Sequence, residues 1–158
     1  MNDSLRNEPQ ISKSQGAFSL VCGVEVNIRA KPENIWRLLT DAKDFPRWNS
    51  TVTRIEGRID NGETIRLHVP GTERTFTPKI SGFVPCERMT WSGGFAPLFK
   101  GVRKFELRPR KDGSTDFAME ERFSGLMLPL ARRSLPDFGA VFERYASDLK
   151  REAEQTGS

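Results

Sequence analysis

The sequence predicts a single α+β domain, in which a seven-stranded, curved antiparallel sheet wraps around a long C-terminal helix, with two short helices between the first and second strands. Three observations favour this class. Apolar residues alternate with a period of two along most of the chain, turn sequences separate these runs, and a helical period is sustained only near the C-terminus. Because consecutive strands follow one another without helices between them, a parallel α/β fold is excluded.

Length and composition agree with one packed domain. The chain has 158 residues, and Leu, Ile, Val and Phe make up about 24% of them, above the roughly 20% below which disorder is expected. We expect residues 1–16 to form a flexible polar tail and residues 17–154 to form the domain. No apolar run suits a membrane span or a signal peptide, and Cys22 and Cys86 are expected to be free thiols. A soluble, cytoplasmic protein is therefore predicted.

The first elements are predicted to be one strand and two short helices. Residues 18–28 alternate between apolar and polar or small side chains, which is typical of a strand with one buried face. Pro32 can begin a helix, because the N–H that it lacks would have no partner there, and this helix is expected to end near Thr40. A second short turn is expected over residues 41–44, ended by Pro46.

Six further strands and the long helix are predicted in the rest of the chain. The strands are expected around residues 51–59, 65–69, 73–83, 89–91, 103–107 and 117–123, with an apolar, glycine-flanked loop over residues 94–101. In the last segment, apolar residues recur at spacings of three and four, which predicts an amphipathic helix with Pro136 near its first turn. Its apolar side consists of Leu135, Phe138, Phe142, Tyr145 and Leu149.

The turn between the last two strands determines which side chains meet. If Phe105 and Phe117 both face the core, this turn has an odd number of residues, and residues 112–114 satisfy that condition. Glu121 then lies opposite Phe105 and one diagonal step from Arg103. On their strands, Arg103 and Glu121 alternate in phase with the apolar residues and therefore face the same side of the sheet. We expect them either to form a structural ion pair at a wet end of the interior, or to orient a ligand or serve as acid and base.

One helix does not fill the concave side of such a sheet, so a cavity is expected between helix and sheet. Its expected lining combines the two charged residues with apolar and aromatic ones: Trp48, Ile55, Leu67, Trp91, Arg103, Phe105, Met119, Glu121, Phe123, Phe138 and Phe142. Taken singly, these aromatic residues are more often plain core. Phe95, Leu98 and Phe99 are expected either to fold back over the sheet or to form a gate at the mouth, and we favour the gate.

Metal, nucleotide and nucleic-acid chemistry are not expected. The single histidine, His68, has the parity opposite to Ile65 and Leu67, which directs it outward, away from a catalytic or metal site. The sequence has no CxxC, HExxH, GxGxxG or P-loop spacing, so no cofactor is predicted. The 25 basic and 21 acidic residues are mixed along the chain, whereas a nucleic-acid surface needs clustered Lys and Arg. Transient membrane contact and a protein partner stay open.

Several short stretches carry information about the family. They are Ile28-Arg29-Ala30-Lys31-Pro32-Glu33, Ile35-Trp36, Leu39-Thr40-Asp41, Phe45-Pro46-Arg47-Trp48-Asn49, Arg88-Met89-Thr90-Trp91, Phe105-Glu106-Leu107-Arg108-Pro109 and Glu121-Arg122-Phe123-Ser124-Gly125. In order and spacing the chain resembles the START-like or SRPBCC superfamily, within it the polyketide cyclase/dehydrase and lipid-transport group, from about Phe18 to Ala153. The resemblance implies a helix-grip fold that holds a small hydrophobic ligand between sheet and long helix. This fold hosts carriers, cyclases, hydroxylase subunits and chaperone regulators, so it does not decide the chemistry.

Three functions agree with these observations. The first is binding or transport of a small hydrophobic ligand, such as a lipid, a polyketide or an aromatic metabolite. The second is a polyketide cyclase/dehydratase-type enzyme, in which Glu121, Arg103 and ordered water move protons around a folded substrate. The third is a regulatory protein-interaction module. Retention of a ligand without conversion distinguishes the first function from the second.

Overall fold

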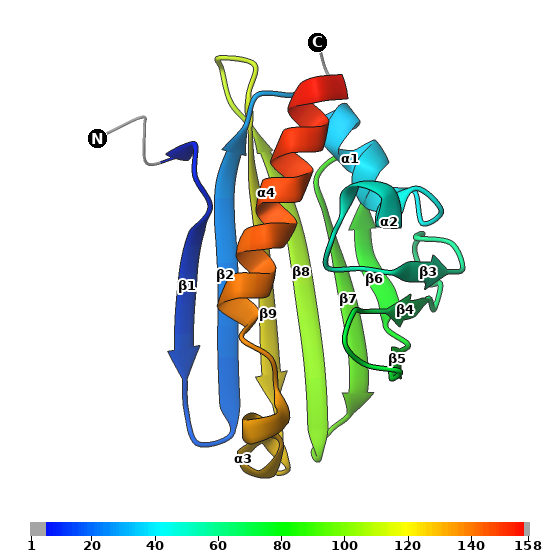
Figure 1. Ribbon diagram of the computed structural model, residues 1–158, viewed down its shortest axis with the longest axis vertical. Coiled ribbons are helices and arrows are strands. Elements are labelled where there is room, and N and C mark those ends of the chain that lie inside the picture. The colour runs from blue at the N-terminus through cyan, green and yellow to red at the C-terminus, as the bar shows by residue number, and fades with distance from the viewer. Residues whose placement is uncertain (1–5, 157–158) are drawn as a thin grey trace.

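A computed structural model describes residues 6–156 and shows one long helix packed on a six-stranded antiparallel sheet (Figure 1). The helix, α4 (Phe138–Thr156), lies across one face of the sheet and packs mainly against β2 and β1. In spatial order the strands are β1 (Gln10–Gln15), β2 (Ser19–Ile28), β9 (Thr115–Ser124), β8 (Phe99–Pro109), β7 (Arg88–Phe95) and β6 (Lys79–Val84). The α+β class and the long C-terminal helix are thus confirmed. No helix in the described residues is long and apolar enough to cross a membrane.

The two short helices expected after the first long strand are confirmed. They are α1 (Pro32–Thr40), which begins at Pro32 as predicted, and α2 (Phe45–Trp48). Pro46 was expected to end the second segment, but it lies in the first turn of α2, where its missing N–H leaves no bond unmade. Both helices contact α4, and α1 also contacts β8, so they lie beside α4 on the same side of the sheet (Figure 1).

The prediction of one seven-stranded sheet is wrong. Three short strands, β3 (Arg54–Glu56), β4 (Arg66–His68) and β5 (Thr75–Phe76), form a separate small sheet. The strand expected over residues 73–83 is interrupted at Pro78, since proline has no N–H to donate to the ladder. Hydrogen bonds from Ile65 N to Pro78 O (3.1 Å) and from Ile80 N to Glu63 O (2.9 Å) keep the small sheet beside β6.

Strand β1 comes from the segment expected to be a tail, so that expectation is corrected for residues 10–15. These residues pair with β2 along their whole length, at the edge of the sheet. All six side chains are exposed, so no buried face imposes the alternation that identifies strands in a sequence. Lys13, in the middle of this edge strand, is a residue type that hinders pairing with another chain. Residues 1–5 of the expected tail lie outside the described residues.

The turn between β8 and β9 consists of Lys111, Asp112 and Gly113, one residue earlier than expected. Arg110 N donates to Ser114 O over 2.8 Å, which closes this three-residue turn. Gly113 has φ +87°, the conformation that the last position of such a turn requires. The pairing is therefore shifted by two residues, and Arg103 lies directly opposite Glu121. Because the shift is even, every side chain keeps the face that parity predicts.

Asp148 on α4 anchors the loop after α2. Its Oδ2 accepts hydrogen bonds from Ser50 N (2.8 Å) and Ser50 Oγ (2.7 Å), and Asp148 is only 7% exposed. We expect Asp148→Ala to lower the free energy of unfolding by about 1–3 kcal/mol, because both donors lose their acceptor. Urea denaturation measures this. Glu143→Ala, an exposed change on the same helix, is the control, and an equal effect of both variants would contradict the anchoring role.

Candidate functional site

Arg103 and Glu121 form an ion pair between the sheet and α4. Arg103 Nη2 and Nε donate to Glu121 Oε2 over 2.5 Å and 2.9 Å. The two side chains are 15% and 14% exposed, so solvent reaches them although their neighbours on the same strand face are buried. The structure thus brings together the two charged residues that the sequence analysis selected.

The surroundings of this pair keep Arg103 charged. Its guanidinium carbon lies 5.3 Å from the centre of the Phe142 ring, a cation–π contact with α4. Burial lowers the pKa of Arg103, but the charge and the hydrogen bond of Glu121, together with Tyr145 and Cys22, outweigh burial and hold this pKa above its ordinary value. On the other side of Glu121 lies Cys22 of β2, and burial raises the pKa of its thiol. Both Cys22 and Cys86 are free thiols.

Tyr145, which the sequence places on the apolar side of the last helix, is the centre of an aromatic cluster. Rings from α2, β8 and β9 surround it, with centroids 6.1–6.4 Å away: Phe45, Trp48, Phe105 and Phe117. Trp91 joins the cluster through Phe105, at 4.9 Å. Side chains therefore occupy this part of the interior, where a cavity was expected. Burial raises the pKa of Tyr145 above its ordinary value of 10.0, while the nearby charge of Arg103 opposes the shift.

Three polar atoms of this cluster have no hydrogen-bond partner in the described part of the chain. They are the Tyr145 hydroxyl, Trp91 Nε1 and Trp48 Nε1, and all three residues are at least 96% buried. Folded proteins rarely leave buried donors unpaired. The position of Tyr145 on the apolar side of a helix predicts only that its ring is buried, and it gives no sign that the hydroxyl lacks a hydrogen-bond partner. As a candidate site residue, Tyr145 was therefore missed.

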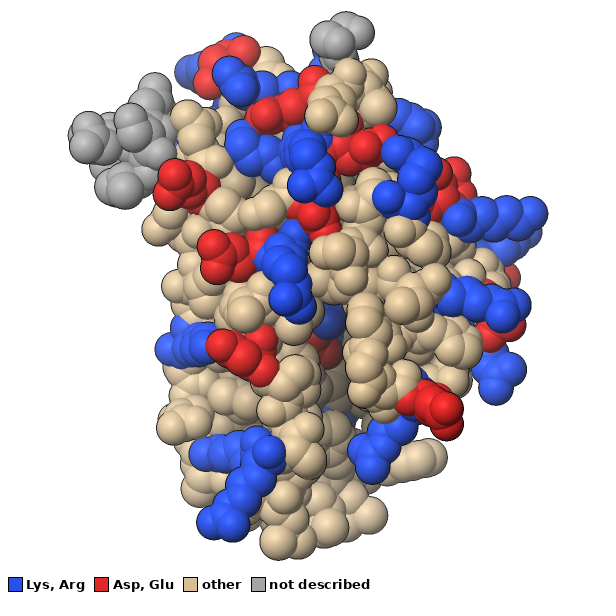
Figure 2. All heavy atoms as spheres, in the orientation of Figure 1, with Lys and Arg blue, Asp and Glu red and all other residues tan. Residues whose placement is uncertain are grey.

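The surface is hollowed between α4 and the small sheet, and basic and acidic atoms lie at the base of this hollow (Figure 2). The partial exposure of Arg103 and Glu121 agrees with a position at its floor. Towards α3 (Leu128–Ala131) a second aromatic series continues from the ion pair. Its ring centroids are 4.8–6.1 Å apart, in the order Phe142, Phe138, Phe123 and Phe99. The hollow therefore has a charged floor, and a series of packed aromatic rings runs from the ion pair towards α3.

The remaining predicted residues fall into two places. Ile55 and Leu67 form a cross-strand pair in the small sheet and belong to the same buried core, as does Met119 opposite Phe105. The expected loop over residues 94–101 is a hairpin, because β7 continues to Phe95 and β8 begins at Phe99. Phe95 and Leu98 point to solvent from its turn. Their role as a gate stays a prediction.

His68 lies outside this site. Its Nε2 is 3.0 Å from Glu56 Oε2 in the small sheet, and this hydrogen bond lowers the pKa of Glu56. Among residues 6–156, no three His, Cys, Asp or Glu side chains gather as a metal site would require.

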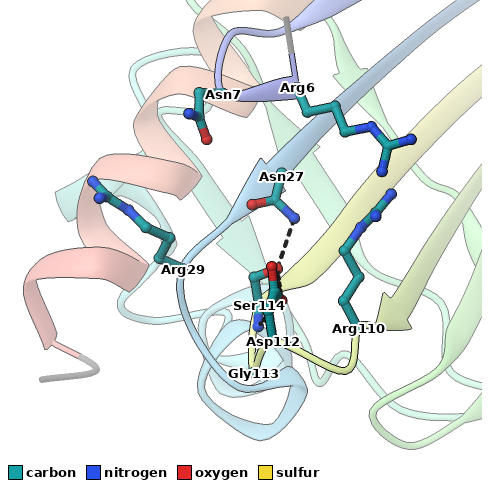
Figure 3. A pocket seen from close by; sticks show the side chains of 8 residues that line it. All are labelled: Arg6, Asn7, Asn27, Arg29, Arg110, Asp112, Gly113 and Ser114. Carbon is teal, nitrogen blue, oxygen red and sulfur yellow. Dashed lines mark hydrogen bonds between the residues drawn. The ribbon is translucent and has the colours of Figure 1, made fainter. Parts of the chain in front are cut away.

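Two surface pockets lie away from the hollow, and neither contains a predicted ligand-binding residue. The pocket in Figure 3 has a volume of about 460 Å³ and is lined by Arg6, Asn7, Asn27, Arg29, Arg110, Asp112, Gly113 and Ser114. Two of its polar side chains already have partners: Asn27 donates to Ser114 Oγ over 2.9 Å, and Arg110 Nε donates to Asp116, which lies outside the lining, over 2.7 Å. The other, of about 540 Å³, lies beside Pro32 and the β6–β7 turn.

The ion pair leads to a prediction about stability. Arg103→Leu or Glu121→Leu leaves one charge in a largely buried place, so each is expected to cost roughly 1–3 kcal/mol after allowance for the remaining exposure. The double variant is expected to cost less than the sum. Urea denaturation of all four forms gives the coupling. The same cycle on the exposed pair Lys13–Asp137 is the control and is expected to give less than about 1 kcal/mol. Additive costs at Arg103 and Glu121 would contradict the coupling.

Tyr145 leads to a prediction about alkaline pH. It is the only tyrosine, so tyrosinate absorbance reports this residue alone. Since its pKa in the folded state lies above the ordinary 10.0, its contribution to stability is complete below pH 10.0 and is lost as pH rises further. We expect tyrosinate to appear only together with unfolding, and Tyr145→Phe to resist alkaline unfolding better than the natural chain. A reversible titration near pH 10.0 in the folded protein would contradict this.

Comparisons with known proteins agree with this architecture. Residues 22–154 match the family described as polyketide cyclase / dehydrase and lipid transport. No curated protein matches the chain. A solved structure from Rhodobacter sphaeroides has a TM-score of 0.69 at 23% identity, covering 92% of this chain and 97% of its own.

Two further solved structures connect the fold to named proteins. A START superfamily protein from Mycobacterium smegmatis has a TM-score of 0.64 at 18% identity, covering 85% of this chain and 97% of its own. The di-domain ARO/CYC protein StfQ of the steffimycin biosynthetic pathway has a TM-score of 0.70 at 15% identity, covering 87% of this chain and 52% of its own. At these identities the likeness shows the fold alone. The match over residues 22–154 is what assigns the family, and the chain belongs to the polyketide cyclase/dehydrase and lipid transport family.

Proposed function

We propose that the protein binds a small, largely apolar molecule with one polar group, in the hollow between α4 and the small sheet. The observation that carries this proposal is the set of buried, unpartnered donors, Tyr145 Oη, Trp91 Nε1 and Trp48 Nε1, behind a partly exposed ion pair. An apolar binding site with a few convergent polar groups is the usual form of a small-molecule site. Membership of a family linked to lipid transport and polyketide cyclases supports the same reading.

The donors favour a particular polar group on the ligand. Tyr145 stays protonated at neutral pH and Trp can only donate, so the ligand is expected to supply an acceptor, such as a carbonyl or hydroxyl oxygen. Arg103 retains further N–H groups beyond the two bound to Glu121. A carboxylate is less suited, because Glu121 already provides the negative charge at Arg103. We expect the aromatic rings that run from the ion pair towards α3 to contact the ligand, and such rings suit a planar or an aliphatic body.

A second candidate function is catalysis by the same groups. Arg103, Glu121 and Tyr145 converge from β8, β9 and α4, and this is the observation that favours an enzyme. Glu121 would accept a proton from carbon next to a ligand carbonyl, while Arg103 and Tyr145 would donate to the developing oxyanion. A cyclase or dehydratase needs such a step.

Native mass spectrometry of the full chain, after incubation with a mixture of lipids and aromatic metabolites, tests the proposal. Retention without conversion supports a carrier. Turnover that disappears in Glu121→Gln while binding persists supports an enzyme. Failure to retain any ligand would contradict the proposal and favour the regulatory protein-interaction module.

For a retained ligand, we expect Tyr145→Phe to raise the dissociation constant by roughly two- to tenfold, because one hydrogen bond is worth about 0.5–1.5 kcal/mol. Trp91→Phe is expected to act in the same direction. Trp36→Phe is the matched control, since Trp36 packs on Phe83 away from the hollow, at 5.1 Å between ring centroids. Tryptophan fluorescence or calorimetric titration measures these constants. Equal effects at Trp36 and Trp91 would exclude the hollow as the binding place.

A further inference from the structure

Three connections meet at the end of the molecule that lies lowest in Figure 1. They are the β1–β2 turn, the β7–β8 turn and the segment from Gly125 through α3, and we call them together the apolar end. Backbone hydrogen bonds of 2.9–3.1 Å join them, from Gly125 N to Phe18 O, from Leu126 N to Pro97 O and from Met127 N to Leu98 O. Segments distant in the sequence thus form one continuous surface.

The apolar end exposes most of the large apolar side chains that reach the surface. Phe95 is 81% exposed and Leu130 is 75% exposed. The others at this end are Phe18, Leu98, Leu126 and Met127. Elsewhere in the described chain, only Ile11 and Phe76 are large, apolar and exposed. Single exposed apolar residues need no explanation, but a contiguous group of them marks an interaction surface.

The charged residues of the apolar end are all basic. Residues 14–24, 94–102 and 122–136 contain no Asp or Glu, and their charges are those of Lys100, Arg122, Arg132 and Arg133. This bias stands out in a chain with 21 acidic residues. Arg132 donates to the carbonyl of Gly16 and so holds the β1–β2 turn, whereas Lys100 and Arg133 are exposed. In Figure 2 the tan lower end of the molecule is bordered by blue side chains.

We propose that the apolar end docks on the surface of an anionic lipid bilayer. Such a surface takes apolar side chains into the boundary of the acyl chains and attracts Lys and Arg at its headgroups, and the apolar end supplies both. A protein partner is less suited. The charges at this end are all basic, and anionic headgroups complement them over the whole bilayer surface, whereas a protein partner would need an acidic and apolar face of about 800 Å² with a matching shape.

A series of packed aromatic rings connects the apolar end with the ion pair. Phe99 of the β7–β8 hairpin stacks on Phe123, which packs on Phe138 and then Phe142 beneath Arg103. If the proposed function holds, this series would let an apolar ligand pass between bilayer and hollow without crossing water. Docking itself does not depend on an interior ligand, so the two proposals can fail separately.

Flotation of the full chain with vesicles tests the docking. We expect binding to vesicles of phosphatidylcholine and phosphatidylglycerol, weaker binding to phosphatidylcholine alone, and loss of binding at high salt. Phe95→Ser combined with Leu130→Ser, and separately Lys100→Glu combined with Arg133→Glu, are each expected to weaken binding roughly tenfold or more. These side chains are exposed, and unchanged urea denaturation confirms that the variants fold.

Matched controls come from the rest of the molecule. Ile11→Ser removes an exposed apolar side chain from β1, and Lys111→Glu reverses a charge in the β8–β9 turn at the opposite end, so both are expected to leave vesicle binding unchanged. Absence of binding to anionic vesicles would overturn the proposal, as would equal losses in the controls. Self-association that depends on Phe95 and Leu130, without vesicle binding, would identify a second copy of this chain as the occupant and would also overturn it.

Discussion

The width of the sheet is the constraint on which this structure depends. Neighbouring strands lie roughly 4.8 Å apart, so the main sheet is about 24 Å wide, whereas a helix with its side chains is only about 10 Å across. α4 therefore covers one part of the inner face, and α1, α2 and the small sheet cover another. The boundary between these two coverings is where Arg103 and Glu121 keep contact with solvent. Charged side chains on the inner face are tolerated at this boundary, because the free-energy cost of desolvating them is lower there than under α4 or under the small sheet.

Parity was the most reliable information in the sequence. It placed Arg103 and Glu121 on the inner face, and an error of two residues in the register did not change that, because faces alternate with every residue. The register depended on which position of the three-residue turn Gly113 occupies. A turn over residues 112–114 makes Gly113 its second residue, whereas in the structure Gly113 is the third and last residue of the turn. The long helix and the strands β2, β7, β8 and β9 were also predictable, since each has a buried face that imposes its own period.

Other features left little trace in the sequence. β1 has no buried side chain, so only its hydrogen bonds to β2 make it a strand. The run over residues 73–83 looks continuous in the sequence, but it is divided at Pro78, which has no N–H to donate, into β5 of the small sheet and β6 of the main sheet. Tyr145 shows how far the sequence can predict the site. The helical period predicts that its ring is buried, but it does not tell whether the hydroxyl group on that ring has a hydrogen-bond partner. Its unpartnered oxygen is visible only once all neighbours are in place.

The contact between Gly125 and the β7–β8 turn bears on how this fold diversifies. A Cβ at Gly125 would lie 2.3 Å from the Leu98 carbonyl oxygen, and its φ of +131° is one that other residues rarely adopt. Only glycine fits the backbone at this position, whereas the neighbouring side chains of Leu98, Leu126 and Met127 are exposed. Single substitutions of these exposed side chains can consequently change the binding partner of this end of the molecule, while the backbone that presents them stays the same.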